Sequence, residues 1–238
     1  MLNLIRSWSD RKCSAEAAKF ARCCSKRLDV PDYFIQLLIL IEDKRFPDHR
    51  GVDPIGILRA IFHNVRRLGK RQGASTLAQQ LYNIRKAKQH KPYPRSFYAK
   101  VVQATFGIWI TCRIPKEEIL SEYLQAVYWG WNFRGLDEAA HGYLGKRRQD
   151  LTVEESFFLI ERLCSPNRSS SRRVEVILRR APVVGVLAAN NSSIDLLRLF
   201  YEQAAATKVS AGNLTRSAIR SANSGIDLGK DEVCMALF

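Results

Sequence analysis

Apolar residues recur with the period of an α-helix in almost every patterned segment of this chain. In the stretch YFIQLLILI, four residues follow the spacing i, i+3, i+4 and i+7: Phe34, Leu37, Leu38 and Ile41. This spacing places them on one buried face of a helix, and Pro31 and Asp32 precede it where a helix can begin. No segment shows convincing alternation of apolar and polar residues, the pattern of a half-buried strand. The sequence therefore predicts an all-α, mainly helical fold.

Two other helices carry a recognisable N-terminal signal. In STLAQQL, Thr76 can cap the start of a helix while Gln79, three residues later, reaches back to it. In LTVEESFF, Thr152 and Glu155 repeat that arrangement. Both segments continue with apolar residues at helical spacing, so each is predicted to form a capped helix.

The carboxyl-terminal part of the chain is more polar. From Asn167 the composition changes to a Ser- and Arg-rich stretch, followed by one predicted helix over 173–187 that Pro182 weakens. Residues 191–238 are rich in Ser and Ala and are predicted to form a loosely packed tail. With 238 residues, 46% of them apolar, the chain is long enough for one main folded unit.

Positive charge is concentrated in one block. The chain has 38 Lys and Arg against 23 Asp and Glu, and the stretch 54–116 holds thirteen of the basic residues and no acidic one. Such a block indicates an anionic partner, either nucleic acid, phospholipid head groups or a phosphorylated substrate, or a solvated basic face. No zinc finger, RNA-binding sheet motif or basic zipper accompanies the charge, so a nucleic-acid partner is not predicted.

Within this block, the segment 56–70 is both basic and amphipathic. Ile57, Ile61 and Val65 lie on one side of a helix, with arginines elsewhere. This pattern is typical of a helix that lies on a membrane surface, and equally of an ordinary surface helix.

The cysteines and the apolar runs exclude several classes of protein. Six cysteines form no CxxC pair and have no histidine at zinc-finger spacing, so neither a metal site nor a disulfide framework is predicted, and the thiols are expected to be buried and reduced. No apolar run approaches the roughly 20 residues that span a bilayer. The first residues lack the apolar region of an export signal.

The stretch EDKRFPDHRGVD follows the first apolar helix directly. Phe46-Pro47 and Gly51 end the helical period, so Glu42 is predicted at the end of a buried helix that runs into a loop. A loop held by a buried helix is a good place for a reactive side chain.

This stretch and four others resemble, in order, the motifs of glycosyltransferase family 51, the peptidoglycan glycosyltransferases found alone or in class A penicillin-binding proteins. The motifs are EDKRFPDHRGVDP, QGASTLAQQL, the helix of Lys100, KEEILSEYLQAVYWG and AAHGYLGKRRQDLTVEESFFLI. The resemblance covers roughly residues 33–167. It implies a lysozyme-like glycosyltransferase domain there, between a basic N-terminal segment, 1–32, and a C-terminal helix and polar tail, 168–238.

The resemblance also implies a reaction and its setting. Members of the family polymerise lipid II: the 4-hydroxyl of the acceptor sugar forms a β-1,4 bond with inversion and displaces undecaprenyl pyrophosphate. The expected partners are lipid II, the nascent glycan strand, the membrane surface and other cell-wall synthesis proteins, at the periplasmic face of the inner membrane. No cofactor and no metal ligand are expected, and a divalent cation such as Mg²⁺ is compatible with the reaction.

Residue roles carry over from the matching motifs. Glu42 is the expected general base, a role worth about 10² to 10⁴ in rate, while Asp43 is expected to be structural and His49 to orient the loop. The resemblance places the donor-site cations and the polar residues of the same cleft at four positions: Ser75, Gln79, Arg95 and Lys100. Lys146, in the last motif, is expected to serve structure or binding.

Four positions depart from the family's usual residues. Gln103 stands where a second glutamate assists at the donor site, and glutamine neither titrates nor carries charge. The others are Asn83 in place of lysine, Thr111 in place of glutamate and Gln125 in place of asparagine. The base is therefore intact while the donor side is altered. Besides polymerisation, a degenerate member that binds lipid-linked or polymeric glycan, and hydrolysis by water in the same cleft, remain open.

Overall fold

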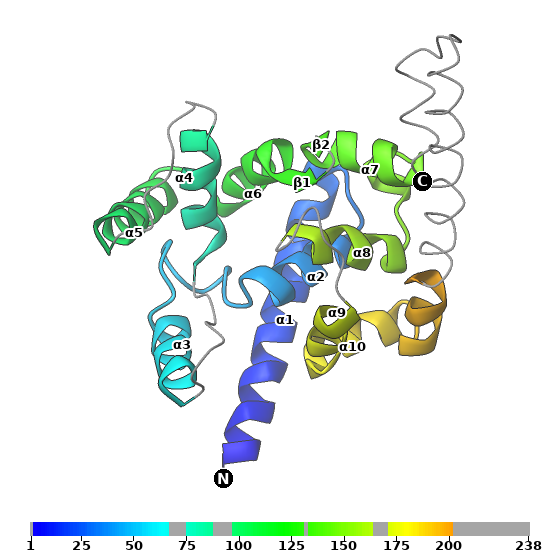
Figure 1. The fold of residues 1–238 in the computed structure, drawn as a ribbon, viewed down its shortest axis with the longest axis horizontal. Helices are drawn as coiled ribbons and strands as arrows, with labels where there is room; N and C mark the ends of the chain where they lie inside the picture. The colour runs from blue at the N-terminus through cyan, green and yellow to red at the C-terminus, as the bar shows by residue number, and fades with distance from the viewer. Residues whose placement is uncertain (1, 67–74, 88–96, 131–132, 164–170, 202–238) are drawn as a thin grey trace, which may run out of the picture.

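A computed structural model describes residues 2–66, 75–87, 97–130, 133–163 and 171–201, and this part of the chain is mainly helical, as predicted (Figure 1). The helices are α1 (Leu2–Leu28), α2 (Asp32–Glu42), α3 (Pro54–Arg66), α4 (Leu77–Ala87), α5 (Phe97–Thr111), α6 (Lys116–Ala126), α7 (Leu136–Leu144), α8 (Val153–Leu163), α9 (Ser171–Leu178) and α10 (Ala181–Ala189). A 3-10 turn, Arg148–Asp150, precedes α8, and a last helix, Ile194–Tyr201, follows α10.

Helix α2 lies at the centre of the larger group of helices, between α1, α8 and α10. The sequence predicted one buried face, but Ile35, Ile39 and Leu40 on the other sides are buried as well. An apolar helix surrounded by packed neighbours is buried all round. Glu42, the last residue of this helix, directly follows the buried apolar run 37–41.

Helix α1 packs along α2 and also contacts α10. Its contact face carries three fully buried small residues, Ala17, Ala21 and Cys24. They follow the spacing i, i+4 and i+7, so they share one face, and their small size lets the neighbouring helix approach closely. The segment predicted only as a basic stretch thus forms a 27-residue helix that helps to cover the core.

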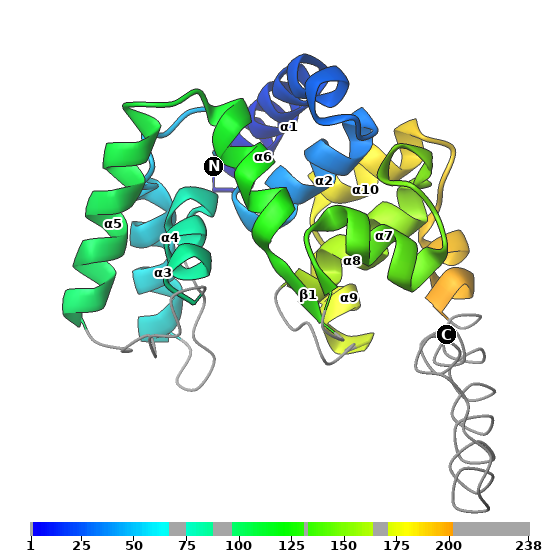
Figure 2. The ribbon, with the colours of Figure 1, turned by 90° about the horizontal axis from the view of Figure 1, so that it is seen from above.

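Helices α3, α4 and α5 form a smaller group beside this core, at the left of Figures 1 and 2. Helix α4 packs against both α5 and α6, and buries Leu77, Ala78 and Leu81. Helix α6 also contacts α7, and therefore joins the smaller group to the rest of the molecule. Helix α3 lies on the same side as α5 (Figure 2).

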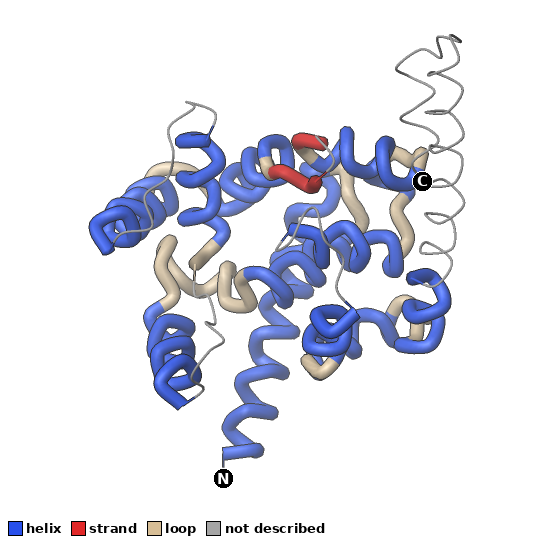
Figure 3. The backbone as a smooth tube through the Cα atoms, in the orientation of Figure 1, coloured by secondary structure: helices blue, strands red, loops and turns tan. Residues whose placement is uncertain are grey.

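Two short strands interrupt the helical architecture (Figure 3). Strand β1 (Tyr128–Gly130) pairs antiparallel with β2 (Phe133–Arg134). The sequence showed no convincing alternation for these strands, because runs of three and two residues are too short to display it. Trp129 points into the core and is fully buried.

The carboxyl-terminal region forms more helices than the sequence predicted. The single helix expected over 173–187 is divided into α9 and α10, with a break at Arg179 and Arg180 and with Pro182 in the first turn of α10. Proline is favourable there because the first turn needs no internal N–H donor. The expected loose tail is wrong for Ile194–Tyr201, a helix whose Leu197 is fully buried. Residues 202–238 lie outside the described part.

The prediction of buried thiols holds for half of the described cysteines. Cys13 and Cys24 are buried, whereas Cys23 and Cys112 are exposed, and all four are free thiols. Burial raises the pKa of the Cys24 thiol to about 12, with a smaller contribution from Glu117. Cys164 and Cys234 lie outside the described residues.

Candidate active site

Glu42 is held at the end of α2 by a side chain from α4. The side-chain Nε2 of Gln80 donates to Glu42 Oε2 at 3.2 Å, and Tyr123 of α6 donates its hydroxyl to Gln80 Oε1 at 2.9 Å. Tyr123 is fully buried, and this burial, together with the charge of Glu42, raises its pKa well above the usual range. The hydroxyl is therefore protonated and acts as a donor.

The loop after Glu42 is fixed by Asp43. One carboxylate oxygen, Oδ1, lies 2.8 Å from His49 Nε2, and the other, Oδ2, accepts the backbone N–H of Leu77 at 3.0 Å. Both side chains are buried. A carboxylate at the first turn of α4 is also favoured by the helix dipole. Asp43 and His49 thus join the loop to α4, the structural roles expected for them.

Three further contacts hold the same loop. Phe46 is buried and packs edge-on against Phe20 of α1, with ring centroids 5.7 Å apart. Lys116, at the start of α6, donates to the carbonyl oxygen of Pro47 at 2.6 Å, and burial lowers the pKa of its ammonium group. Arg45 forms an ion pair with Asp53, whose Oδ1 accepts the N–H of Gly56 at 2.8 Å and so caps α3.

Gly51 allows the loop to touch α5. Its φ is +84°, and a Cβ atom at this position would lie 2.0 Å from the carbonyl oxygen of Gly107. Only glycine is compatible with both the backbone conformation and the contact. The carbonyl oxygen of Gly51 also accepts the hydroxyl of Thr76 at 2.6 Å. The loop is therefore closed against both α4 and α5.

Both predicted capping boxes are present. The N–H of Thr76 donates to Gln79 Oε1 at 3.1 Å and the N–H of Gln79 donates to Thr76 Oγ1 at 3.3 Å, and Thr152 and Glu155 make the same pair of bonds at 2.8 and 3.3 Å. Gln79 is buried by this arrangement, and it is the next residue, Gln80, that contacts Glu42.

Lys100 and Gln103 meet beside the start of α4. The ammonium group of Lys100 donates to Ser75 Oγ at 3.1 Å and to Gln103 Oε1 at 3.0 Å. Gln103 is fully buried, and within the described residues its Nε2 has no hydrogen-bond partner. These acceptors are neutral, so they orient the ammonium group without cancelling its charge. Arg95 lies outside the described residues.

Base and cation are connected through one short segment. Ser75 contacts Lys100 and Gln80 contacts Glu42, and five residues of chain separate the two contacts, a span of at most about 18 Å even if extended. Among the described residues, Lys146 contacts neither the base Glu42 nor the cation Lys100. Its ammonium lies 2.9 Å from Glu155 Oε1, and the ion pair braces the capping box of α8.

The remaining departures from the family pattern lie on α4, α5 and α6. Asn83 Oδ1 is buried and has no hydrogen-bond partner among the described residues. Thr111 donates its hydroxyl to the carbonyl oxygen of Gly107 at 2.7 Å, within α5. Gln125 is exposed and donates to Ser121. Within the described residues, Thr111 and Gln125 hydrogen-bond to Gly107 and Ser121 and not to the base or to Lys100.

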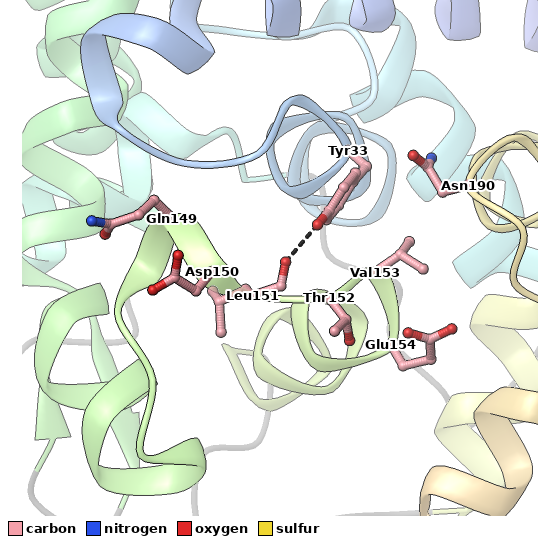
Figure 4. A pocket seen from close by; sticks show the side chains of 8 residues that line it. All are labelled: Tyr33, Gln149, Asp150, Leu151, Thr152, Val153, Glu154 and Asn190. Carbon is pink, nitrogen blue, oxygen red and sulfur yellow. Dashed lines mark hydrogen bonds between the residues drawn. The ribbon is translucent and has the colours of Figure 1, made fainter.

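A separate pocket of about 320 Å³ lies at the other end of α2. It is lined by Tyr33, Gln149, Asp150, Leu151, Thr152, Val153, Glu154 and Asn190, and the Tyr33 hydroxyl donates to the carbonyl oxygen of Leu151 (Figure 4). Tyr33 is in the first turn of α2 and Glu42 is its last residue, a rise of roughly 14 Å along the helix. The pocket is therefore distinct from the group around Glu42.

An apolar surface lies on the side of the molecule that carries α3 and α5. The exposed fractions on α3 are 63% for Ile55, 66% for Leu58 and 58% for Phe62. On α5, Tyr98, Val101, Ile108 and Trp109 are exposed as well. Among the described helices, none alone is long and apolar enough to cross a bilayer; only the pair Ala181–Ala189 and Ile194–Tyr201, bent by 88°, meets that test of length and composition.

The order of these residues along the chain matches a known protein family. Residues 13–186 match the family model described as transglycosylase. The chain belongs to the transglycosylase family, which is glycosyltransferase family 51. The match begins within α1 and ends within α10, so it includes α2, α8 and the parts of α1 and α10 from residue 13 to residue 186.

Curated relatives agree with this assignment. Over 180 residues, 72% of this chain, penicillin-binding protein 1A of Haemophilus influenzae is 35% identical and that of Vibrio cholerae is 33% identical. Penicillin-binding protein 1A of Streptococcus oralis is 29% identical over 204 residues, 82% of this chain. The matched region spans 21% of the first two relatives and 30% of the third.

Sequence reasoning missed three residues near the base: Gln80, Tyr123 and Arg180. Arg180 lies between α9 and α10, and its Nη1 donates to the carbonyl oxygen of Ile41 at 2.9 Å, at the C-terminal end of α2. The doublet Gln79-Gln80 signals a polar site but does not show which residue faces it. Nothing in the local sequence connects Arg180 to a residue 139 positions earlier.

Proposed function

We propose that this protein is a peptidoglycan glycosyltransferase that polymerises lipid II into β-1,4-linked glycan strands and releases undecaprenyl pyrophosphate. The observation that carries the proposal is the placement of Glu42: a carboxylate at the end of a buried helix, held by Gln80, with Lys100 held by the same segment. A proton acceptor and a cation are the two groups that the reaction requires.

In the proposed mechanism, Glu42 takes the proton of the acceptor's 4-hydroxyl as that oxygen attacks the anomeric carbon of the donor. The bond from this carbon to the pyrophosphate oxygen breaks, and inversion leaves a β-linkage. Lys100 offsets negative charge on the departing pyrophosphate. Because Ser75 and Gln103 orient the ammonium group without neutralising it, the full positive charge is available to the leaving group.

The substrate's lipid tail gives a role to the apolar surface of α3 and α5. We infer that this surface rests on the bilayer at the periplasmic face of the inner membrane, with Ile55, Leu58 and Phe62 among the lipid chains. Arg59, an exposed basic residue of α3, would then face anionic head groups. Residues 33–167 are inferred to carry the chemistry, and α1, α9 and α10 to support α2.

One observation favours a second function, a binding module for lipid-linked glycan that does not polymerise it. Gln103 is neutral and fully buried where the family usually has a glutamate. If a carboxylate were essential at that position, the cleft would bind lipid II without turnover.

A single assay tests both functions. Purified full-length protein in phospholipid vesicles is incubated with labelled lipid II, and the products are separated into polymer, hydrolysed sugar and unreacted lipid, with binding measured in parallel. Polymer is expected. Bound but unreacted lipid II would support the binding module, hydrolysed sugar would support a lysozyme-like hydrolysis, and neither binding nor turnover would overturn both proposals.

A further inference from the structure

Three side chains from three helices form a short hydrogen-bonded chain that ends at the base. Tyr123 on α6 donates to Gln80 Oε1 at 2.9 Å, and Gln80 on α4 donates from Nε2 to Glu42 Oε2 at 3.2 Å. Tyr123 is fully buried and α6 packs directly against α4. The position of Gln80 is therefore set from the side opposite to Glu42.

The direction of each bond follows from chemistry. An ionised carboxylate can only accept, so the amide nitrogen of Gln80 must face Glu42 and its carbonyl oxygen must face Tyr123. The Tyr123 hydroxyl has a proton to donate and satisfies that oxygen. If the amide turned over, its carbonyl oxygen would face the carboxylate, and two acceptors would repel each other. The buried hydroxyl therefore stabilises the one amide orientation that suits an ionised base.

We propose that Tyr123 is a positioning residue for Glu42, acting through Gln80 to hold the carboxylate in one orientation before the acceptor sugar binds. This inference rests on the proposed function, since it assigns Glu42 the role of base. Tyr123 does not touch the substrate. Its contribution is to remove the alternative orientations of Gln80, so that the carboxylate meets the same N–H donor in every turnover.

Tyr123→Phe removes only the hydroxyl and keeps the ring in its buried place. We expect kcat to fall about tenfold with KM within about twofold of the parent, because substrate contacts are intact while the base is less well held; tenfold corresponds to about 1.4 kcal/mol of barrier. Tyr143→Phe is the matched control. It removes another buried hydroxyl, which donates to the carbonyl oxygen of Trp129, and should leave kcat unchanged.

A double-mutant cycle tests whether Tyr123 acts through Gln80. Gln80→Met keeps the length of the side chain and removes the amide. If Tyr123 acts only through that amide, Tyr123→Phe should cost nothing further in the Gln80→Met background. Independent, additive losses in kcat would overturn the proposal, and so would a parent-like kcat of Tyr123→Phe while Glu42→Gln is inactive. In the latter case the proposed function would survive.

A spectroscopic readout separates the inference from the activity. The side-chain NH₂ signals of Gln80, assigned by their loss in Gln80→Met, should be displaced from those of a free glutamine amide in the parent. They should move toward the free position in Tyr123→Phe and stay in place in Tyr143→Phe. Unchanged Gln80 signals in Tyr123→Phe would overturn the positioning role whether or not the parent polymerises lipid II.

Discussion

The side of the site that holds Glu42 and the side that holds Lys100 are built differently. Glu42 is the last residue of the largely buried helix α2, and the loop after it is tied by buried groups such as Asp43 and His49. Lys100 is an exposed residue of α5, and its ammonium group is held by Ser75 and Gln103 through neutral hydrogen bonds. The base is fixed by the core, whereas the cation is placed at the surface.

This difference separates two requirements of one reaction. Proton transfer is sensitive to distance and direction, so a rigid support is favourable for the base. Electrostatic stabilisation of a leaving group falls off slowly with distance, so a cation can act from a less rigid position. Substitutions on the two sides should therefore differ both in size and in kinetic character.

The largest effect is expected for Glu42→Gln. The change is nearly isosteric and preserves the contact with Gln80 in shape, but it removes the group that accepts the proton, so polymerisation should fall by about two or more orders of magnitude. The measurement is the rate of polymer formation from labelled lipid II, with thermal unfolding to show that the fold is kept. Glu175→Gln, which removes a carboxylate paired with Arg198, is the matched control and should be neutral. Near-full activity of Glu42→Gln would remove Glu42 as the base.

A smaller effect is expected for Lys100→Met, which keeps the side-chain length and removes the charge. The value of kcat/KM should fall about tenfold, because the loss affects both the bound pyrophosphate and its departure. Raising the salt concentration should lower the kcat/KM of the parent more than that of the variant. Lys19→Met, at an exposed position of α1, is the control. An unchanged kcat/KM would mean that the donor side depends on other cations.

Gln103→Glu should change turnover in the opposite direction. A carboxylate here could exchange a proton or hold a cation beside the pyrophosphate, and we expect this gain to exceed the loss of net positive charge at Lys100, so lipid II turnover should rise several-fold. Gln125→Glu, exposed on α6, is the control. A fall in turnover would show that the donor side is adapted to a neutral residue. If neither parent nor Gln103→Glu polymerises lipid II while both bind it, the binding module remains.

The smallest effect is expected at the apolar surface. Replacing Leu58 and Phe62 by Ser should reduce flotation of the protein with anionic vesicles, because less apolar area enters the bilayer, while the remaining binding should weaken as salt rises. Val176→Ser, an exposed apolar residue on α9, is the control and should bind as the parent does. Failure of the parent to float at low salt would contradict the bilayer inference.

The sequence predicted best those features that depend on near neighbours in the chain. The end of α2 at Glu42, and both capping boxes, follow from residues within a few positions of one another. Features that depend on packing between distant segments were not predictable in this way. The buried faces of α2 away from Phe34, the contact of Gln80 with Glu42, and Arg180 beside Ile41 all require knowledge of which helices meet.

The contact between Gly51 and Gly107 has a consequence for how the site can vary. The loop after the base and the helix of Lys100 touch through their main chains, because a Cβ on Gly51 would lie 2.0 Å from the carbonyl oxygen of Gly107. Gly107 is seven residues, about two turns, beyond Lys100 on α5. This contact sets the distance between the backbone of the loop after Glu42 and the backbone of α5, while the ammonium group of Lys100 keeps the freedom of its side chain. A side chain at position 51 would therefore push the loop that follows Glu42 away from the helix that carries Lys100.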